Sequence, residues 1–211
     1  MRNRALLTAS LALVAFAGMS TAASATTIKT TAGATVATGA GISGSLKVGT
    51  SATLSGGSAG NIVCTSSSFS GTIGTNPATA SVSGSLTVLT FSNCTDTIPF
   101  VTVASVTTNV SAGTPKTATA TYAGAASTFA VSGIVATVTF TDNKTCVYAP
   151  TTDPATAQHN SLTSPWNAEY AFAAIPLTKT GGTSFACPSA NVTWSATYFA
   201  TSGGVGITIQ P

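Results

Sequence analysis

Two glycine-rich segments have the spacing of catalytic or nucleotide-binding motifs. Residues 56–60 (GGSAG) fit the G-x-S-x-G pattern that presents a nucleophilic serine, here Ser58, and an acid and His159 follow in the order of a hydrolase triad. That motif needs a helix directly after the serine, but the residues after Gly60 read as a strand. Residues 39–44 fit G-x-G-x-x-G without the flanking strand, helix and acid of a dinucleotide site. We therefore expect a protein that is not an enzyme, with a serine hydrolase as the alternative, and no cofactor.

Side chains that could bind a metal are scarce and scattered. The chain has 1 His and 4 Asp or Glu residues, and the acids stand far apart in the sequence. Zinc and copper sites need clustered His, Cys or carboxylate ligands, and calcium needs several oxygen ligands together. We predict no metal site.

Aromatic and polar side chains gather in residues 146–172. Between positions 150 and 165 the sequence has no strand pattern, and loops of that length are uncommon unless they are functional or disordered. The candidate ligand-binding residues in and beside this loop are Tyr148, His159, Trp166 and Tyr170. Together they would form a surface that stacks on a sugar or contacts an apolar ligand. The alternative is that Trp166 and Tyr170 belong to the core and that the loop is a solvated connector.

Charge is too sparse for most ionic functions. Charged residues make up 5% of the chain, whereas a soluble domain usually has about 25%. Polarity comes instead from 41 Thr and 26 Ser residues. Binding to nucleic acid needs clustered Lys and Arg, so we expect no nucleic-acid partner. Sheet edges with so little charge are poorly protected, which predicts self-association or contact with cell-wall or surface components.

The first 25 residues have the pattern of a secretory signal peptide. Arg2 and Arg4 precede the apolar run 5–18, and Ala-Ser-Ala at 23–25 is an A-x-A cleavage site. The apolar run is shorter than the ~20 residues of a spanning helix. We expect a secreted or cell-wall-associated protein with no membrane span after cleavage.

The rest of the chain divides by composition. Residues 26–43 are rich in Thr, Ala and Gly, which predicts a flexible leader outside the core. Residues 44–211 suit a single β domain. A resemblance between the segments 82–94 and 131–142 leaves open two similar halves, about 44–112 and 113–211.

Four cysteines in an exported chain are typical of two disulfides. They are Cys64, Cys94, Cys146 and Cys187. Three connectivities are open, and the spacings match neither redox nor zinc motifs. We favour Cys64 with Cys94 and Cys146 with Cys187.

Alternating side chains predict strands. In residues 134–140 and 192–198, apolar side chains on one face alternate with Thr and Ser on the other. Turn residues separate the candidate strands at the spacing of sandwiches and barrels. We expect an all-β fold, a β-sandwich or partly open barrel of about 8–11 antiparallel strands with two disulfides.

The chain resembles secreted β-rich proteins of actinomycete type that are distantly similar to the Pra-type alkane-oxidation activators. The segments that carry the resemblance are IVCTSS (62–67), LTFSNC (89–94), IPF (98–100), and Cys187 before TWSATY (193–198). Phe100 stands where such proteins often have Trp. The resemblance implies an exported disulfide-bonded β fold, supports pairing of Cys64 with Cys94, and suggests cell-surface, biofilm or hydrocarbon-uptake roles. It transfers no active site.

These observations favour a non-enzymatic secreted or cell-surface structural or interaction protein. The alternative is a secreted binding module for a small apolar ligand or a carbohydrate.

Overall fold

The computed structural model describes residues 25–56, 59–159, 168–188 and 191–211. These residues form an all-β fold, as composition and alternation predict. Every strand pairing is antiparallel. The strands are β1 (Thr27–Thr30), β2 (Gly41–Leu46), β3 (Ala52–Ser55), β4 (Asn61–Ile73), β5 (Ser81–Asp96), β6 (Val103–Thr108), β7 (Lys116–Thr121), β8 (Thr128–Val131), β9 (Ala136–Phe140), β10 (Thr145–Pro150), β11 (Ala155–His159), β12 (Glu169–Gly182), β13 (Val192–Ser202) and β14 (Val205–Gln210).

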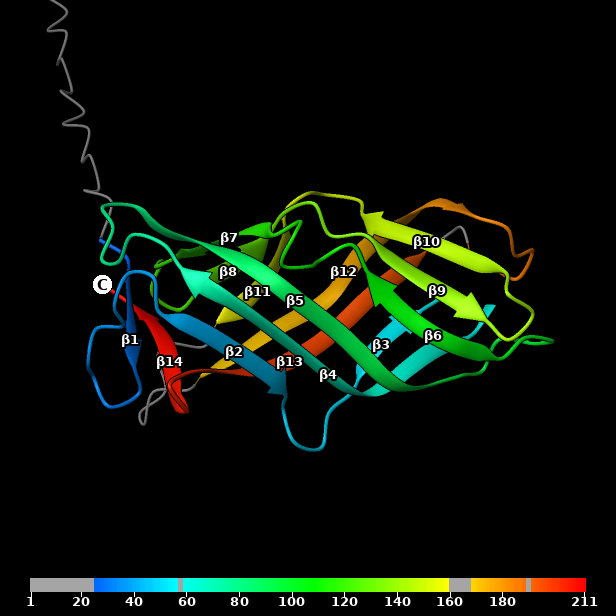
Figure 1. The fold of residues 1–211 in the computed structure, drawn as a ribbon, viewed down its shortest axis with the longest axis horizontal. Helices are drawn as coiled ribbons and strands as arrows, with labels where there is room; N and C mark the ends of the chain where they lie inside the picture. The colour runs from blue at the N-terminus through cyan, green and yellow to red at the C-terminus, as the bar shows by residue number, and fades with distance from the viewer. Residues whose placement is uncertain (1–24, 57–58, 160–167, 189–190) are drawn as a thin grey trace, which may run out of the picture.

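The strands form an elongated barrel built on four long strands, β4, β5, β12 and β13 (Figure 1). At one end, pairings run from β13 through β2, β4, β5, β7, β8, β11 and β12 and return to β13. The sheet therefore closes on itself, and we call this end the closed end. The sequence left open whether the chain consists of two similar halves, about 44–112 and 113–211. The closed ring contains strands of both, because β5 pairs with β7 and β13 pairs with β2.

At the other end, β3, β6, β9 and β10 continue the wall between the same long strands. Pairings run from β6 through β9, β10, β12, β13, β3 and β4 to β5. β5 and β6 lie side by side, but no hydrogen-bonded ladder joins these two fully described strands. We call this interruption the seam, and this end of the barrel the seamed end.

Two polar contacts hold the seam. The hydroxyl of Thr108 in β6 donates to the carbonyl of Leu89 in β5 over 2.9 Å. The carboxylate of Asp96 accepts from the backbone N–H of Val103 at 2.6 Å and of Ile98 at 3.2 Å. The turn between β5 and β6 is thus fixed by side chains where a backbone ladder is missing.

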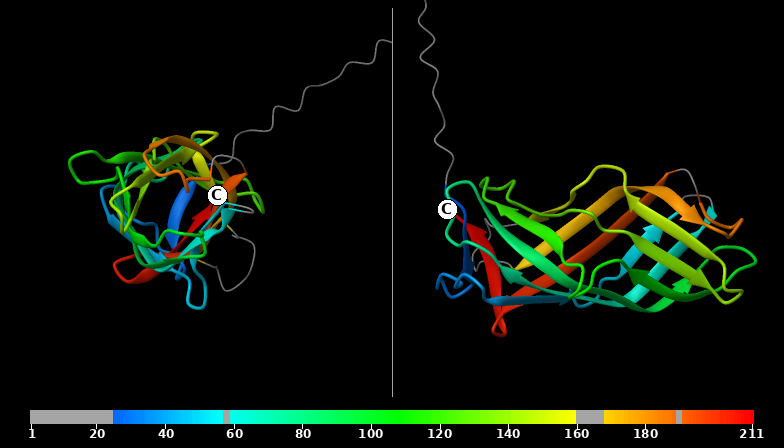
Figure 2. Two further views of the ribbon diagram at one scale, coloured as in Figure 1. Left: turned by 90° about the vertical axis from the view of Figure 1, so that its right-hand side faces the viewer. Right: turned by 45° about the horizontal axis from the view of Figure 1, so that its top comes forward.

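The closed end is capped by the two termini of the barrel domain. β1 pairs with β14, and these two strands lie across one end of the barrel in the end-on view (Figure 2). The prediction that residues 26–43 form a leader outside the core is wrong, because Ile28, Val36 and Ile42 are all buried in the core. Few apolar side chains anchor this segment, but those few are buried. Composition alone therefore does not show that the segment belongs to the core.

The number of strands exceeds the eight to eleven expected because short segments without an apolar signature also pair. β1 lies in the expected leader, and β11 lies in the expected loop. Both are held by neighbouring strands, β14 in one case and β8 with β12 in the other. Pairing with neighbouring strands therefore stabilises segments whose own preference for β structure is weak.

The interior is apolar because alternate residues of each strand point inward. In β13, Val192, Ala196, Tyr198 and Ala200 are buried, and the residues between them are hydroxyl-bearing or more exposed. In β2, Gly44 makes room for a large neighbour, because a Cβ at this position would overlap the ring of Phe69.

The outer faces carry hydroxyl groups that bond across strands. Examples are Ser68 with Thr90 at 2.9 Å and Thr72 with Ser85 at 2.8 Å. Among the described residues no helix is long and apolar enough to cross a membrane.

Both predicted disulfides are confirmed, and both lie at the seamed end. Cys64–Cys94 links β4 to β5, and Cys146–Cys187 links β10 to the loop after β12. No cysteine is free.

Candidate functional site

Three of the four residues of the predicted aromatic surface are buried. The side chains of Tyr148, His159 and Tyr170 are 1%, 0% and 3% exposed, so they face the interior. Trp166 lies outside the described residues, and so does part of the predicted loop. The strand β11 occupies residues 155–159, where no strand pattern was seen. The alternative that Tyr170 belongs to the core is therefore correct.

His159 and Tyr170 fasten the cap at the closed end. The Nδ1 of His159 is 2.9 Å from the carbonyl oxygen of Glu169, and its Nε2 is 2.9 Å from the hydroxyl of Thr208 in β14. The ring stacks on Tyr170 at 4.5 Å, and the hydroxyl of Tyr170 donates to the carbonyl of Ile207. Both ring nitrogens are occupied, so His159 has no nitrogen left for a substrate.

Burial sets the protonation of these groups. Desolvation lowers the pKa of His159, partly offset by its hydrogen bond with the backbone of Glu169. Desolvation also raises the pKa of the Tyr170 hydroxyl. Both groups are therefore held neutral, which suits a structural role.

The serine hydrolase hypothesis concerns Ser58, His159 and the element after Gly60. Ser58 lies outside the described residues, and His159 lies at the closed end of the barrel. The residue that follows Gly60 begins the strand β4, not a helix. Within the described residues, no three His, Cys, Asp or Glu side chains form a group that could hold a metal ion.

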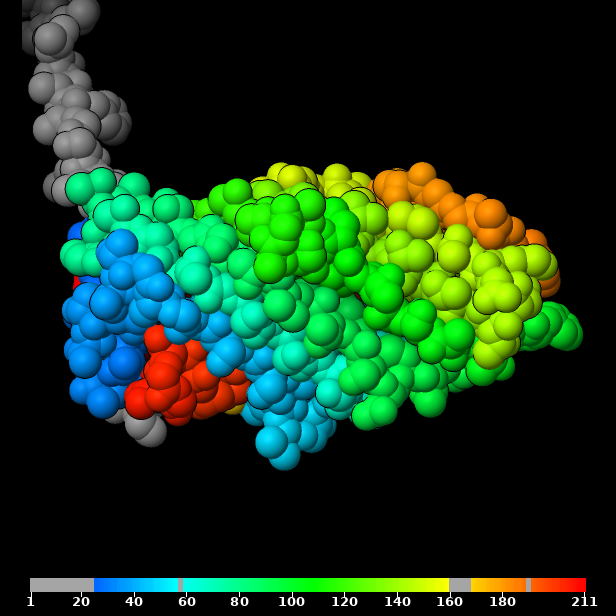
Figure 3. Space-filling view, in the orientation of Figure 1, coloured from blue at the N-terminus to red at the C-terminus, as the bar shows by residue number. Residues whose placement is uncertain are grey.

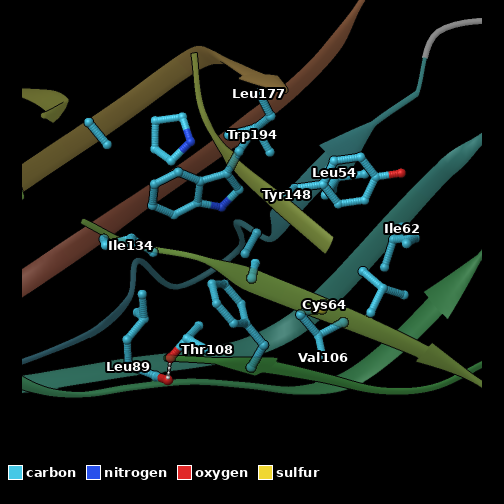
Figure 4. Close-up of a pocket in the computed structure, with 16 residues that line it drawn as sticks. Leu54, Ile62, Cys64, Leu89, Val106, Thr108, Ile134, Tyr148, Leu177 and Trp194 are labelled. Carbon is cyan, nitrogen blue, oxygen red and sulfur yellow. Dashed lines mark hydrogen bonds between the residues drawn. The ribbon is translucent and has the colours of Figure 1, made fainter. Parts of the chain in front are cut away.

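Tyr148 leads to a different candidate site, an apolar cavity in the seamed end (Figure 4). Its volume is about 50 Å³. The large side chains around it are Leu54, Ile62, Leu89, Phe91, Val106, Ile134, Val138, Tyr148, Leu177 and Trp194. They come from both sides of the seam, since Leu89 and Phe91 belong to β5 and Val106 belongs to β6.

Almost every polar group on the cavity wall is already paired. The Tyr148 hydroxyl donates to the carbonyl of Pro188 at 3.1 Å, and burial raises its pKa to about 12. The hydroxyl of Thr108 donates to Leu89. The indole nitrogen of Trp194 is the exception, because it is shielded from solvent and has no hydrogen-bond partner.

Two smaller voids continue inward from this cavity. A void of about 10 Å³ shares Leu89, Ile134 and Trp194 with it. A further void of about 40 Å³ under the cap shares Phe69 and Phe129 with the small one. A series of small voids therefore runs through the interior from the seamed end to the cap.

Aromatic rings separate these voids and touch in sequence. The chain of ring contacts runs through His159, Tyr170, Phe129, Phe69, Tyr198, Phe172, Trp194 and Phe91. Centroid distances along it range from 4.5 to 6.4 Å. The rings belong to strands that are distant in sequence, and they give the barrel one continuous aromatic core.

Two phenylalanines are exposed on the loops of the seamed end. Phe100 is 95% exposed in the loop between β5 and β6, which projects from this end in the space-filling view (Figure 3). Phe185 is 76% exposed in the loop after β12, and the ammonium of Lys144 lies 5.4 Å from its ring centroid. Neither residue belongs to the predicted site.

Sequence reasoning missed most of this cavity. Trp194 was assigned to the apolar face of its strand, which is where the structure places it. The residues that line the cavity with Trp194 come from eight other strands and from the segment before β9, and only the pairing of those strands reveals that they surround one space.

Comparison of the chain with protein-family models, with curated proteins and with solved structures finds no match. The resemblance to Pra-type proteins therefore stays a prediction.

Proposed function

We propose that the protein is a non-enzymatic, exported binding module for a small apolar molecule, which it holds in the cavity of the seamed end. The observation that carries this proposal is the cavity of about 50 Å³ with an apolar wall formed on both sides of the seam. An export role is supported by the signal-like first 25 residues and by two disulfides.

The chemistry of the wall favours an apolar occupant. Apolar cavities in proteins stay dry and take up small apolar molecules or xenon, because water there would lack hydrogen-bond partners. Each part of the ligand surface that leaves water stabilises the complex by roughly 25 cal/mol per Å². A carbohydrate would have to leave many hydroxyl groups unpaired against this wall, which costs binding free energy.

The seam offers a path into the cavity. Separating β5 from β6 breaks no backbone ladder between them, whereas every neighbouring pair in the closed ring is joined by one. The Thr108 hydroxyl bond and the Asp96 turn are the polar contacts that resist opening. Ligand exchange should therefore leave the closed end intact.

The test uses xenon and pentane as probes on the intact, disulfide-bonded protein. Binding followed by NMR should shift methyl signals of Leu89, Val106 and Leu177. Ala136→Leu, which fills the cavity from β9, should abolish these shifts. The matched control is Ala118→Leu, which fills only the void under the cap and should leave them unchanged. If neither xenon nor pentane binds, the proposal is overturned.

The exposed phenylalanines favour a second function, a structural or interaction role at the cell surface. Phe100 and Phe185 present apolar rings at the loops of one end, and exposed apolar groups of this size mark contact sites when they cluster. Self-association or attachment to the cell wall through this end should weaken in a Phe100→Ser, Phe185→Ser double variant. Cell fractionation and sedimentation measure the two outcomes, and unchanged attachment and mass would remove this candidate.

A further inference from the structure

The cavity wall contains one buried hydrogen-bond donor that nothing in the described structure satisfies. The Nε1–H of Trp194 has no acceptor, and in Figure 4 this nitrogen lies on the side of the ring toward the middle of the lining residues. An indole N–H that is buried without an acceptor costs free energy. Buried tryptophans usually find a partner for this group.

The ring cannot easily turn to find another partner. Trp194 packs against Phe172 at 4.6 Å and against Phe91 at 6.4 Å between ring centroids. On its strand, Trp194 is paired with Leu54 on one side and Ile175 on the other. The donor is therefore held in place by packing on several sides.

A water molecule would be a poor partner at this position. A buried water typically makes about three hydrogen bonds. The other polar side-chain groups of the wall use their protons elsewhere, since Thr108 donates to Leu89 and Tyr148 donates to Pro188. A molecule that brings one acceptor and otherwise apolar surface matches the wall better.

The acceptor should be neutral. No Lys, Arg, His, Asp or Glu residue lines the cavity. An ionised carboxylate placed there would lose its hydration without a charged partner, and that cost is much larger than one indole hydrogen bond returns.

We infer that the ligand is a neutral, mainly apolar molecule with one oxygen acceptor, such as a small ketone or ester, and that the Trp194 N–H donates a hydrogen bond to that oxygen. This inference rests on the proposed function, because it assigns the ligand class of the same cavity. Trp194 is then a specificity-determining residue: it selects a carbonyl compound over a hydrocarbon of the same shape.

Two other buried polar atoms of the described residues also lack a hydrogen-bond partner. They are the Oδ1 of Asn61 and the Nε2 of Gln210. Neither residue lines the cavity.

The experiment compares pentane with pentan-2-one, two chains of equal length of which only one has an acceptor. The protein carries two tryptophans, so Trp166→Phe leaves a single indole N–H signal in the NMR spectrum, that of Trp194. Pentan-2-one should move this signal downfield and pentane should not. This readout needs no change at Trp194, so it stands even if variants there fail to fold.

Affinity measurements give the second readout. In Trp194→Phe the ratio of pentan-2-one to pentane affinity should fall about fivefold, the loss expected for one neutral hydrogen bond. The control Leu177→Val trims the apolar wall and should weaken both ligands while leaving the ratio unchanged. Binding of both ligands with no indole shift and no change of ratio would overturn this inference and leave the proposed function standing. Failure of both ligands to bind would overturn the proposed function itself.

Discussion

The two ends of the barrel are built on the same four long strands but are held together by different interactions. At the closed end every neighbouring strand is joined by a ladder, and β1 and β14 cover the opening. At the seamed end one ladder is missing, both disulfides are present, and an apolar cavity of about 50 Å³ lies between the walls.

In this chain with so little charge, the two ends are stabilised by different kinds of interaction. The closed end relies on buried polar side chains that bond to the backbone, Asn76, His159 and Tyr170 among them. The seamed end relies on covalent bonds, which tolerate a missing ladder because they restrict the unfolded chain whatever the local pairing. At the seamed end, β5 and β6 can therefore separate without unfolding of the closed end.

The largest expected effect comes from removing a disulfide at the seamed end. Cys146→Ser combined with Cys187→Ser should lower the free energy of unfolding by about 4 kcal/mol, since the bond closes a long loop. Hydrogen exchange should rise in β9 and β10 and stay slow in β7 and β8. Equal loss of protection in all four strands would show that the two ends unfold as one unit.

The next effect should come from the closed end. Asn76 accepts from the N–H of Ile28 at 2.8 Å and donates to the carbonyls of Ile28 at 2.9 Å and Val36 at 2.6 Å. Asn76→Ala should cost about 2–3 kcal/mol, because buried backbone groups lose their partners. Denaturant unfolding measures this cost.

A matched control for Asn76 is available on an exposed loop. Asn109 also makes two side-chain hydrogen bonds to the backbone, with Gly133 and Val135, but both are exposed to solvent. Asn109→Ala should cost less than about 1 kcal/mol, because water replaces the lost bonds. A cost equal to that of Asn76→Ala would contradict the role given to burial.

The pH dependence of stability should report on His159 alone between pH 7 and 5, because the chain has 1 His. Burial lowers its pKa in the folded protein below the ordinary 6.5, so the unfolded chain binds the proton more tightly. The stability contribution is complete above about pH 6.5 and is lost as the pH falls below that value, with a slope of at most about 1.4 kcal/mol per pH unit.

The control for this titration is His159→Gln, which keeps a polar side chain but does not titrate. Unfolding curves of the variant should be flat over the same pH range. A slope that persists in the variant would assign the pH dependence to other groups.

The smallest effect should come from the seam. Thr108→Val removes the hydroxyl bond to Leu89 and should cost about 1 kcal/mol. The neighbouring Thr107 is exposed, and Thr107→Val should be close to neutral. Unfolding by denaturant distinguishes the two, and equal effects would mean that the bond does not stabilise the seam.

Sequence reasoning predicted the fold class and both disulfides because their signals are local or few in number. Alternation in residues 192–198 gave the inward face of β13 correctly. β11 was missed because its inward residues are Ala155, Ala157 and His159: the two alanines are too small to mark an apolar face, and the histidine is polar. These two alanines are buried beside larger side chains that belong to other strands.

The site was predicted less well than the fold. Tyr148 flanks a segment without strand pattern, which predicted a surface position, but residues 155–159 of that segment form β11, and Tyr148 lies in β10 in the barrel wall. Closure of the barrel depends on pairing of β13 with β2, whose residues are more than 100 positions apart. No periodicity within a short window contains that information.

The hydroxyl pairs on the outer faces have a consequence for the conditions the protein tolerates. Ser68 with Thr90, and Thr72 with Ser85, are neutral pairs that neither titrate near neutral pH nor depend on ionic strength. Salt screens interactions between charges, and only two ion pairs are present among the described residues. The hydration of these faces should therefore be nearly the same in dilute buffer and in brine.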